Sequence, residues 1–502
     1  MKESLNFIYK EQKELSNFGG IAALLGWDQM TYMPLKGIEE RSEQISLISR
    51  LTHEKVISDE LWSHVRKLSD PSILNELEKK DRIVVIRLEK DIEKARKIPA
   101  DFVEELSKAT SLAYGAWQGA REENKFVVFA PHLKKIIELE KKYCNYMSLP
   151  GHPYNSLLDD YEEGMTVEKL REAFSYLKPQ LVEILTRIKE SERFNRQHDL
   201  KIKFNLDKQK EMCHFLLKTM LMPDDQSRID VSIHPFSTSI GYDDVRITTN
   251  FGREQPLFAF FSTMHEAGHA LYELGFPKGD FKDTVISDAP SLGLHESQSR
   301  FWENMIGHSK AFWNYFYPVF QRAFSDQLKN VDFDSWYFYV NQVKPSFIRI
   351  EADELTYCLH VILRFEIEMD LISEKIKVSE LPAVWNEKMK EMLGITPRTD
   401  KEGVLQDMHW SGGDFGYFPT YAIGTIYASQ LFNQLVKEKP EVTQQIARGE
   451  FKDIIEWLRE HVHRFGRMMT AEEIVEKTCH EGLNPQIFVS YLKEKYYTLY
   501  EI

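Results

Sequence analysis

The sequence predicts a mainly α-helical protein with one small β-structured segment, and three observations support this fold class. Apolar residues recur at three- and four-residue spacing over most of the chain, among many Glu, Lys and Arg, as they do on amphipathic helices. Helix boundaries are legible, because Pro99 precedes one such stretch and Gly151-His152-Pro153 ends another. Only residues 229–250 show the period-two alternation that is typical of strands.

The helical pattern divides into segments that turn-forming residues separate. The first half of the chain contains predicted helices at residues 36–66, 74–97, 101–124, 128–147, 167–193 and 207–222. Another helix, from Phe261 to Leu274, follows the strand-like segment. Beyond it the pattern returns at residues 291–308, 310–328, 333–342, 346–373, 379–393, 417–438, 441–448, 450–463 and 470–478. Because we find no internal repeat and no Ser/Gly-rich linker, we expect residues 1–502 to form a single domain.

The strand-like segment is expected to form a β-hairpin. Residues 229–234 and 244–249 both alternate between apolar and polar side chains, and Gly241 lies in the turn region between them. The edge of such a hairpin, just before the helix from Phe261 to Leu274, could hold an extended peptide straight. The alternative is a hairpin that only packs against the rest of the protein.

Composition excludes several classes of protein. The net charge of −14 argues against nucleic acid as a partner, because nucleic-acid binding usually needs a basic face. The four cysteines are scattered, with no C-x-x-C pair, which is typical of free thiols in a reducing compartment. The N-terminus lacks the apolar core of a signal peptide, and no apolar run approaches 18 residues. We therefore expect a cytoplasmic protein without a membrane-spanning segment.

The most informative motif is His265-Glu266-Ala267-Gly268-His269, which reads H-E-x-x-H. On a helix, positions i and i+4 lie on the same face, so both imidazoles can bind one metal ion. Glu266 is offset by about 100° of helix rotation, where its carboxylate can take a proton from a water on the metal. The motif therefore predicts metal-assisted hydrolysis, most often of peptide bonds.

The alternative is an amphipathic helix with two solvated histidines. Two features argue against it. Gly268 lies mid-helix, where Gly costs about 1 kcal/mol relative to Ala, and this indicates that another part of the chain approaches the backbone closely. The flanking residues Phe258, Phe260, Phe261 and Leu271 are apolar, which predicts a buried helix whose histidines need partners.

A catalytic zinc site usually has three protein ligands and one open position, so a third ligand must come from elsewhere. The metzincin extension is absent, because Tyr272 and Gly275 stand where Gly and His would be. Glu296 on the following predicted helix is the favoured candidate, since an antiparallel return would place it opposite the histidines. Glu273 shares the helix with both histidines and cannot easily complete the site, so the alternatives are Asp280, Asp283 and Asp288 in the following connection, or a solvated Glu296. Glu303, two turns beyond Glu296, could orient a ligand histidine or could be a surface charge.

Together these motifs make the chain resemble the Taq-type metallocarboxypeptidases, the thermostable carboxypeptidase family, over most of its length. The motifs that carry the resemblance are Trp27-Asp28 with Met33-Pro34, His234-Pro235-Phe236, Asp244-Val245-Arg246-Ile247-Thr248, the H-E-x-x-H motif, His295-Glu296-Ser297-Gln298, Ile348-Arg349-Ile350-Glu351-Ala352-Asp353-Glu354, Gly403-Val404-Leu405-Gln406-Asp407-Met408-His409-Trp410 and Gly416-Tyr417-Phe418-Pro419-Thr420-Tyr421.

The resemblance implies an elongated, multi-helix fold with a deep groove, similar to neurolysin-type peptidases, and commonly a homodimer. It implies His265, His269 and Glu296 as ligands of one divalent metal ion, most often zinc, with cobalt able to substitute. It also implies removal of single residues from the C-terminus of peptides, with broad specificity.

The chemistry assigns further roles. Glu266 would take the water proton and deliver it to the leaving amine. The oxyanion of the tetrahedral intermediate needs a hydrogen-bond donor besides the metal. Tyr421 is the preferred donor, with His234 and His409 as the next candidates. The alternative for Tyr421 is a hydrogen bond to a backbone carbonyl.

An exopeptidase must also bind the free carboxylate of its substrate, and a planar guanidinium suits that group. Arg349, near a predicted helix start, and Arg246, on the hairpin, are the candidates, and the resemblance adds Gln406 and the rest of the 403–410 loop to the substrate-binding set. Either arginine could instead pair internally, Arg349 with Asp353 or Arg246 with Asp244.

Two rival functions remain at this stage. The first is an endo-oligopeptidase with an open groove and no carboxylate-binding residue. The second is a non-catalytic binding protein on a peptidase scaffold, which the presence of the base and of all proposed ligands disfavours.

Overall fold

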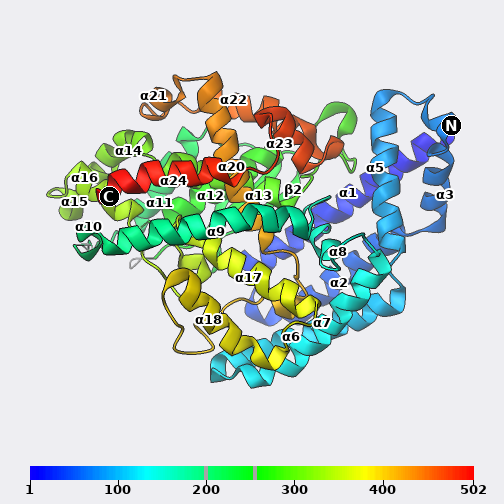
Figure 1. The fold of residues 1–502 in the computed structure, drawn as a ribbon. Helices are drawn as coiled ribbons and strands as arrows, with labels where there is room; N and C mark the ends of the chain where they lie inside the picture. Colours follow the sequence, from blue (N-terminus) through cyan, green and yellow to red (C-terminus); the bar gives the residue numbers. More distant parts are fainter. Residues whose placement is uncertain (197–199, 201, 253–256) are drawn as a thin grey trace.

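Helices form most of the structure, a computed structural model that describes residues 1–196, 200, 202–252 and 257–502. The mainly α fold class is confirmed. Helices α1, α3 and α5 gather at one end of the molecule, and the C-terminus lies on the opposite side (Figure 1). Within the described residues, none of the helices combines the length and the apolar composition needed to cross a membrane.

The helices before the sheet are α1 (Lys2–Thr31), α2 (Ile38–Val56), α3 (Asp59–Leu68), α4 (Pro71–Leu74), α5 (Lys79–Arg96), α6 (Ala100–Glu123), α7 (Phe126–Met147), α8 (Asn155–Leu158), α9 (Val167–Glu190), α10 (Glu192–Asn195) and α11 (Leu206–Thr219). The strands are β1 (Ser227–Val231), β2 (Ser237–Gly241) and β3 (Asp244–Thr249). The helices that follow are α12 (Phe258–Leu274), α13 (Leu292–Arg300), α14 (Lys310–Ala323), α15 (Ser325–Leu328), α16 (Phe333–Asn341), α17 (Tyr357–Ile372), α18 (Leu381–Leu393), α19 (His409–Gly412), α20 (Pro419–Glu438), α21 (Val442–Ile446), α22 (Lys452–His461), α23 (Ala471–Cys479) and α24 (Pro485–Tyr500). Short 3-10 turns lie at Leu35–Gly37, Gly279–Phe281, Arg349–Glu351, Val378–Glu380 and His463–Met468, and a π-helical segment lies at Phe301–Gly307.

Most predicted helices are present, and the differences have local causes. The predicted helix at 36–66 is two helices, because the Ser58 side chain accepts a hydrogen bond from the Leu61 N–H and starts α3 there. The predicted helix at 346–373 begins only at Tyr357. Before it, the Asp353 carboxylate accepts hydrogen bonds from the backbone N–H groups of Lys344 and Thr356 and holds residues 344–356 in a loop.

The predicted hairpin between residues 229–234 and 244–249 is wrong in its strand pairing. These two stretches are neighbours in the sheet, but β1 pairs with β3 in parallel. The stretch between them forms a third strand, β2, which pairs with β3 antiparallel, so the sheet order is β1-β3-β2. The turn of the real hairpin lies at Tyr242-Asp243, just after Gly241. The chain reverses direction once between β1 and β2 and again between β2 and β3, so β1 and β3 run in the same direction.

The sheet binds the N-terminal helix through aromatic and cationic side chains. The guanidinium of Arg246 lies 4.3 Å from the ring centre of Trp27 on α1, and that of Arg228 lies 5.3 Å from the same ring centre. The Tyr32 hydroxyl, at the end of α1, donates to Asp230 on β1. Gly20 packs directly on the backbone of β2, because a Cβ there would lie 2.5 Å from the Ile240 carbonyl oxygen.

Most buried apolar residues belong to one large core that includes α12, α13, α17 and α20. A second, smaller cluster joins α1, α3 and α5 and contains Ile8, Leu61, Val65 and Leu88. The helix that carries the H-E-x-x-H motif, α12, is therefore central, as its apolar flanks predict.

Candidate active site

Helix α12 presents His265 and His269 on one face, one turn apart, to a carboxylate on α13. The Nε2 atoms of His265 and His269 lie 3.6 and 3.5 Å from the same oxygen, Oε2 of Glu296. All three donor atoms lie within 4.8 Å of one another. Two imidazole nitrogens and one carboxylate oxygen are a donor set of catalytic zinc sites, so these residues fit a divalent cation. Glu296 is thus the acidic candidate that the structure brings to the histidines.

Glycines allow α13 to lie this close to its neighbours. A Cβ at Gly268 would lie 2.7 Å from the Gln298 carbonyl oxygen and 2.8 Å from the Ser299 Cα, both on α13. On the other side of α13, a Cβ at Gly424 of α20 would lie 2.8 Å from the Cβ of Glu296. The close approach that Gly268 predicts is therefore the backbone of the helix that carries the third donor.

The start of α13 is fixed by a buried carboxylate. Glu162, which follows α8, accepts a hydrogen bond from the Gly293 N–H at 3.0 Å, and the Ser291 side chain accepts one from the Leu294 N–H. Burial raises the pKa of Glu162 to about 8. These contacts satisfy backbone donors in the first turn of α13 and set the position of Glu296 one turn later.

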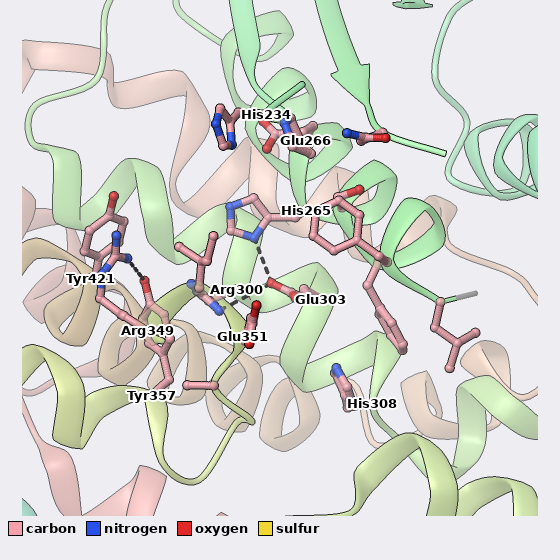
Figure 2. Close-up of a pocket in the computed structure, with 18 of the residues that line it drawn as sticks. His234, His265, Glu266, Arg300, Glu303, His308, Arg349, Glu351, Tyr357 and Tyr421 are labelled. Carbon is pink, nitrogen blue, oxygen red and sulfur yellow. Dashed lines mark hydrogen bonds and ion pairs between the residues drawn. The ribbon is translucent and has the colours of Figure 1, made fainter. Parts of the chain in front are cut away.

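His265 is held on its other side by Glu303. Its Nδ1 lies 2.7 Å from Oε2 of Glu303 (Figure 2), as expected for a carboxylate that orients a metal-binding imidazole. Burial alone would lower the pKa of His265, but Glu296 and Glu303 outweigh it and raise that pKa to about 9. Burial would raise the pKa of Glu303, yet Arg300 and His265 hold it at about 2.

His269 has a different environment. Its ring stacks on that of His295, with ring centres 4.2 Å apart, and the Nε2 of His295 lies 3.0 Å from Glu273. Burial and the neighbouring charge of His295 lower the pKa of His269 to about 3. Glu273 therefore interacts with His295 and does not join the three donor atoms.

Glu266 lies on the wall of a cleft of about 1450 Å³ that also contains the three donor residues. Its side chain is buried, and burial raises its pKa to about 7. A proton acceptor beside a hydrolytic metal needs this position: next to the ligands, on the same helix, and facing the substrate space.

Of the three candidate oxyanion donors, Tyr421 and His234 line this cleft. Tyr421 lies in the first turn of α20, and His234 lies in the connection between β1 and β2 (Figure 2). His409 does not lie on the cleft wall. Its ring packs against those of Tyr417 and Phe418, and burial lowers its pKa to about 4, so it is a neutral side chain behind the wall.

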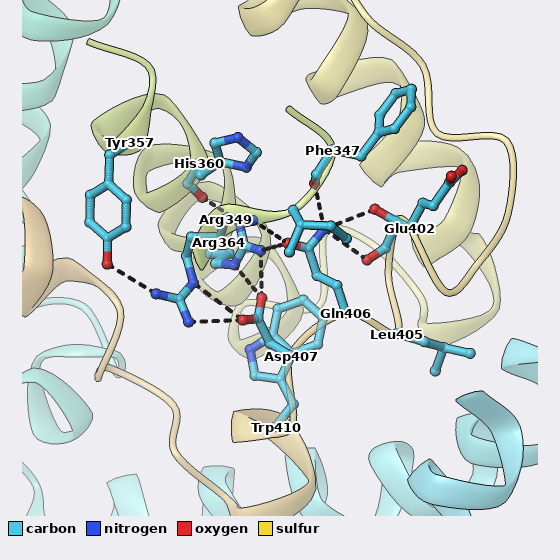
Figure 3. A network of polar contacts seen from close by, with 12 residues as sticks. Phe347, Arg349, Tyr357, His360, Arg364, Glu402, Leu405, Gln406, Asp407 and Trp410 are labelled. Atoms are coloured by element: carbon cyan, nitrogen blue, oxygen red, sulfur yellow. Dashed lines mark hydrogen bonds and ion pairs between the residues drawn. The ribbon is translucent and has the colours of Figure 1, made fainter. Parts of the chain in front are cut away.

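Arg349 also lies on the cleft wall, in a network of charged groups (Figure 3). Its Nε and one terminal nitrogen donate to Oδ1 of Asp407 at 3.2 and 3.0 Å, and the other terminal nitrogen donates to the Tyr357 hydroxyl at 3.0 Å. The second carboxylate oxygen of Asp407 accepts hydrogen bonds from Arg364. Its internal partner is therefore Asp407, and Asp353 instead caps the loop before α17.

Gln406 and Arg246 stabilise the structure around the cleft and do not line it. The Gln406 carbonyl accepts from the backbone N–H of Arg349 and from Arg364, and its amide donates to the Phe347 carbonyl. Arg246 forms a two-point ion pair with Asp244, at 2.8 Å for each contact, besides its contact with Trp27. This is the internal pairing left open for Arg246.

Comparison with known proteins agrees with this geometry. A family model described as Carboxypeptidase Taq (M32) metallopeptidase matches residues 7–496. The chain belongs to this family. It is 38% identical over 488 residues to Carboxypeptidase 1 of Bacillus subtilis, with 97% of each chain covered. It is 40% identical over 496 residues to Thermostable carboxypeptidase 1 of Pyrococcus furiosus, with 98% of each chain covered.

Solved structures of Taq-type carboxypeptidases have the same fold. The M32 carboxypeptidase from Deinococcus radiodurans superposes with a TM-score of 0.95 at 35% identity, with all of both chains covered. Metallocarboxypeptidase 1 of Trypanosoma cruzi gives 0.95 at 33% identity, over 99% of this chain and all of that chain. The chain is therefore a metallocarboxypeptidase, a hydrolase of peptide bonds that depends on a divalent metal ion.

Sequence reasoning missed two residues of this Taq-type site. Arg300 donates to Glu296, four residues before it on α13, a spacing at which charged residues meet on a helix, so the sequence did contain that signal. Tyr357 contacts both Arg300 on α13 and Arg349 in the loop before α17, and no local pattern indicates a residue that joins two segments so far apart in the sequence.

Proposed function

We propose that His265, His269 and Glu296 hold one zinc ion, and that the chain uses it to remove single residues from the C-termini of peptides. The observation that carries this proposal is that the three donor atoms, the Glu266 carboxylate and the Arg349 guanidinium meet in one cleft. A divalent cation in that position acidifies a water molecule and polarises the scissile carbonyl.

In this reaction Glu266 is the general base. Its carboxylate takes a proton from the attacking water and delivers it to the nitrogen of the leaving amino acid. One group can serve both steps, because the attacking water oxygen and the leaving nitrogen are bonded to the same carbon and the two proton transfers follow one another. The buried position of Glu266 keeps bulk water from competing for that proton.

Tyr421 is the proposed donor to the carbonyl oxygen as it gains negative charge. Burial raises the pKa of Tyr421 above its ordinary value, so the hydroxyl keeps its proton at neutral pH and can donate it in a hydrogen bond. His234, in the connection between β1 and β2, is the second candidate. His409 is not preferred, because it packs against Tyr417 and Phe418 and does not line the cleft.

Arg349 is the proposed partner of the substrate carboxylate. Charge counting supports this role, because Arg349 and Arg364 carry two positive charges and share one carboxylate, Asp407. The surplus positive charge lies at the cleft wall, on Arg349, where a substrate anion would compensate it. An endo-oligopeptidase would have no use for such a charge, so the exopeptidase is favoured. Arg246 is proposed to hold the sheet to α1.

Several finer properties belong to the same proposal. Zinc is the proposed metal, with cobalt able to substitute, because both accept two imidazoles and a carboxylate in an open site. We also propose a cytoplasmic enzyme that forms a homodimer, with residues 1–502 acting as a single catalytic domain. The four cysteines, all free and buried in the structure, are consistent with a reducing compartment.

The test is mass spectrometry of peptides that differ only in a free or an amidated C-terminus. We expect stepwise loss of C-terminal residues from the free acid, little cleavage of the amide, no activity after removal of the metal, and recovery with zinc or cobalt. Arg349→Met should lower kcat/KM for the free acid about 100-fold, about 3 kcal/mol, the effect of an unpaired charge at a binding site.

Arg246→Met is the matched control. Arg246, like Arg349, forms an ion pair with an aspartate, but it does not line the cleft. It should lower thermal stability and leave the preference for free acids intact. Equal cleavage of both peptides at internal bonds would contradict the carboxypeptidase assignment. An unchanged preference in Arg349→Met would contradict its role alone.

A further inference from the structure

Arg300, at the end of α13, lies between the two acidic residues of the metal site. Its Nε donates to Oε1 of Glu296 at 2.7 Å, and a terminal nitrogen lies 3.4 Å from Oε2 of Glu303. On its other face the guanidinium lies 4.2 Å from the ring centre of Tyr357. Only 13% of the Arg300 side chain is exposed. Arg300 is thus held on both sides in a single orientation.

The two oxygens of the Glu296 carboxylate consequently have different surroundings. Oε2 faces the Nε2 atoms of His265 and His269, while Oε1 is taken by Arg300. The Ser299 hydroxyl lies 3.0 Å from Oε2, but it lies closer, at 2.7 Å, to the backbone carbonyl of Glu296, and it has only one proton to donate. Oε2 therefore keeps lone pairs for a cation, whereas Oε1 is engaged in a charge-assisted hydrogen bond.

A carboxylate can bind a metal through one oxygen or through both. This difference matters in a hydrolytic site, because a catalytic zinc has three protein ligands and needs the remaining position for water and substrate. A second oxygen from Glu296 would occupy part of that space. The side chain that decides between the two modes is the one that binds Oε1.

We propose that Arg300 is a positioning residue that withholds Oε1 of Glu296 from the metal, so that the carboxylate offers one oxygen and a coordination position stays open. The inference rests on the metal site proposed above. Arg300 acts through Glu296 and need not touch the substrate. Its positive charge also offsets one of the two acidic charges, Glu296 and Glu303, that it contacts.

The direction of the effect follows from what replaces Arg300. In a variant with a neutral, apolar side chain, Oε1 becomes a buried charged oxygen without its donor, which is costly. A cation bound to Oε2 of the same carboxylate could satisfy it. Removal of the guanidinium also removes a positive charge that repels the cation. Metal binding is therefore maintained or strengthened while hydrolysis slows, the opposite of what loss of a merely structural residue would do.

The experiment uses the full chain with Arg300→Met and Arg300→Lys, loaded with zinc or with cobalt. Zinc affinity is measured by competition with a chromophoric chelator, the metal environment by the visible spectrum of the cobalt form, and the reaction by kcat and KM on a peptide with a free C-terminus. Cobalt reports coordination number, because four-coordinate sites absorb more strongly than five- or six-coordinate ones.

We expect Arg300→Met to lower kcat by about 10- to 100-fold, the usual effect of losing a group that orients a metal ligand. Zinc affinity should be equal to or tighter than that of the wild type, and the cobalt bands should weaken as the coordination number rises. Arg300→Lys keeps the charge and one donor, so it should retain the wild-type cobalt spectrum and lose less than about tenfold in kcat.

Arg87→Met is the matched control, because Arg87 on α5 is equally buried, with 14% of its side chain exposed, and binds Glu163 outside the cleft. It should leave the cobalt spectrum and kcat as they are in the wild type. Thermal unfolding of each variant verifies that the chain is folded. If Arg300→Met does not fold, Arg300→Lys decides, since a higher coordination number in that variant contradicts the proposal.

Three results would overturn the inference. Zinc affinity could fall together with kcat, which would make Arg300 a support for the ligand and nothing more. KM could rise with kcat and the cobalt spectrum unchanged, which would make Arg300 a contact of the substrate carboxylate. All parameters could remain those of the wild type. A wild-type chain that binds no zinc would instead contradict the proposed metal site, so the two failures are distinguishable.

Discussion

Two glutamates of the site, Glu266 and Glu296, both interact electrostatically with His265, but their other neighbours shift their pKa values in opposite directions. Burial raises the pKa of Glu266 to about 7. Burial acts on Glu296 in the same direction, but Arg300 and His265 outweigh it and hold the pKa of Glu296 well below its ordinary value. Glu296 therefore stays charged, as the proposed ligand role requires, and Glu266 can exchange a proton, as the proposed base requires.

Replacing Glu266 by Gln tests this division of roles. The amide keeps the size of the side chain and cannot accept a proton, so we expect kcat to fall by about 10³- to 10⁴-fold, the upper range for loss of a general base. The metal content, measured by elemental analysis after dialysis, should remain one ion per chain. Activity comparable to that of the wild type would refute Glu266 as the base.

At the residue scale, the spacing of residues along the sequence predicted which side chains share one helix. It did not predict which side chains from distant parts of the chain contact one another. The H-E-x-x-H motif and the Glu296 helix follow from the periodicity of single helices. The partner of Arg349 does not follow from this periodicity. Spacing along a helix favours Asp353, four residues away, whereas the partner in the structure is Asp407, in a loop more than fifty residues later. The three-dimensional fold determines which charged residues pair, so distance along the sequence does not identify the partner.

At the scale of elements, the site depends on three helices, α12, α13 and α20, packed at close distance through Gly268 and Gly424. A methyl group at Gly268 would meet backbone atoms of α13, which cannot rotate away as a side chain can. Gly268 thus exchanges helix propensity for a short distance between the histidines and Glu296.

We predict that Gly268→Ala lowers the free energy of unfolding by about 1–3 kcal/mol, the usual cost of overpacking. It should also weaken zinc binding about 10-fold or more, because α13 must move away with Glu296. Denaturant unfolding and chelator competition measure the two effects.

Gly115→Ala is the control for Gly268→Ala. Gly115 lies mid-helix in α6, and a Cβ there has no neighbour within 4 Å. The change should stabilise the chain by about 0.5–1 kcal/mol, since Ala is the better helix former. A Gly268→Ala variant that behaves like Gly115→Ala would show that α13 tolerates the methyl group.

Two long helices that sequence reasoning missed share a physical cause. Helix α1 contains Gly19, Gly20 and Gly26, and α24 is rich in aromatic and β-branched residues, so both have low intrinsic helix propensity. Tertiary packing overrides it. In the same way, alternation located β1 and β3 but not β2, and the order and direction of strands depend on the connection that the chain takes between them.

At the scale of the whole molecule, four segments of the chain bring acidic groups together. Glu140 on α7 lies near Asp160, Asp414 and Glu368, which belong to different parts of the chain. Burial, with these charges, raises the pKa of Glu140 to about 8. Only 5% of Glu140 is exposed, so its ionisation is resisted by the fold.

This cluster predicts how stability depends on pH. The folded pKa of Glu140 is raised above its ordinary value of 4.5, so its contribution is fully present below pH 4.5 and is lost as the pH rises to about 8. Glu140→Gln removes that loss. The variant should match the wild type near pH 4.5 and exceed it by a few kcal/mol at pH 8.

Denaturant unfolding of both proteins across this pH range measures the difference. Glu138→Gln, on the same helix but with 54% of its side chain exposed, is the control and should change stability by only a few tenths of a kcal/mol at any pH. A difference between wild type and Glu140→Gln that is constant with pH would contradict the buried, protonated state of Glu140.

During synthesis the ribosome releases His265, His269 and Glu296 well before the segments that support them. Arg349 follows, then Asp407, which holds it, and last α20, which carries Tyr421 and backs α13 through Gly424. A nascent chain therefore holds the three proposed metal ligands before Asp407 can hold Arg349 and before α20 forms part of the cleft wall. Since a domain generally folds as a unit, we expect an unfinished chain to have no activity on the C-termini of other new chains around it.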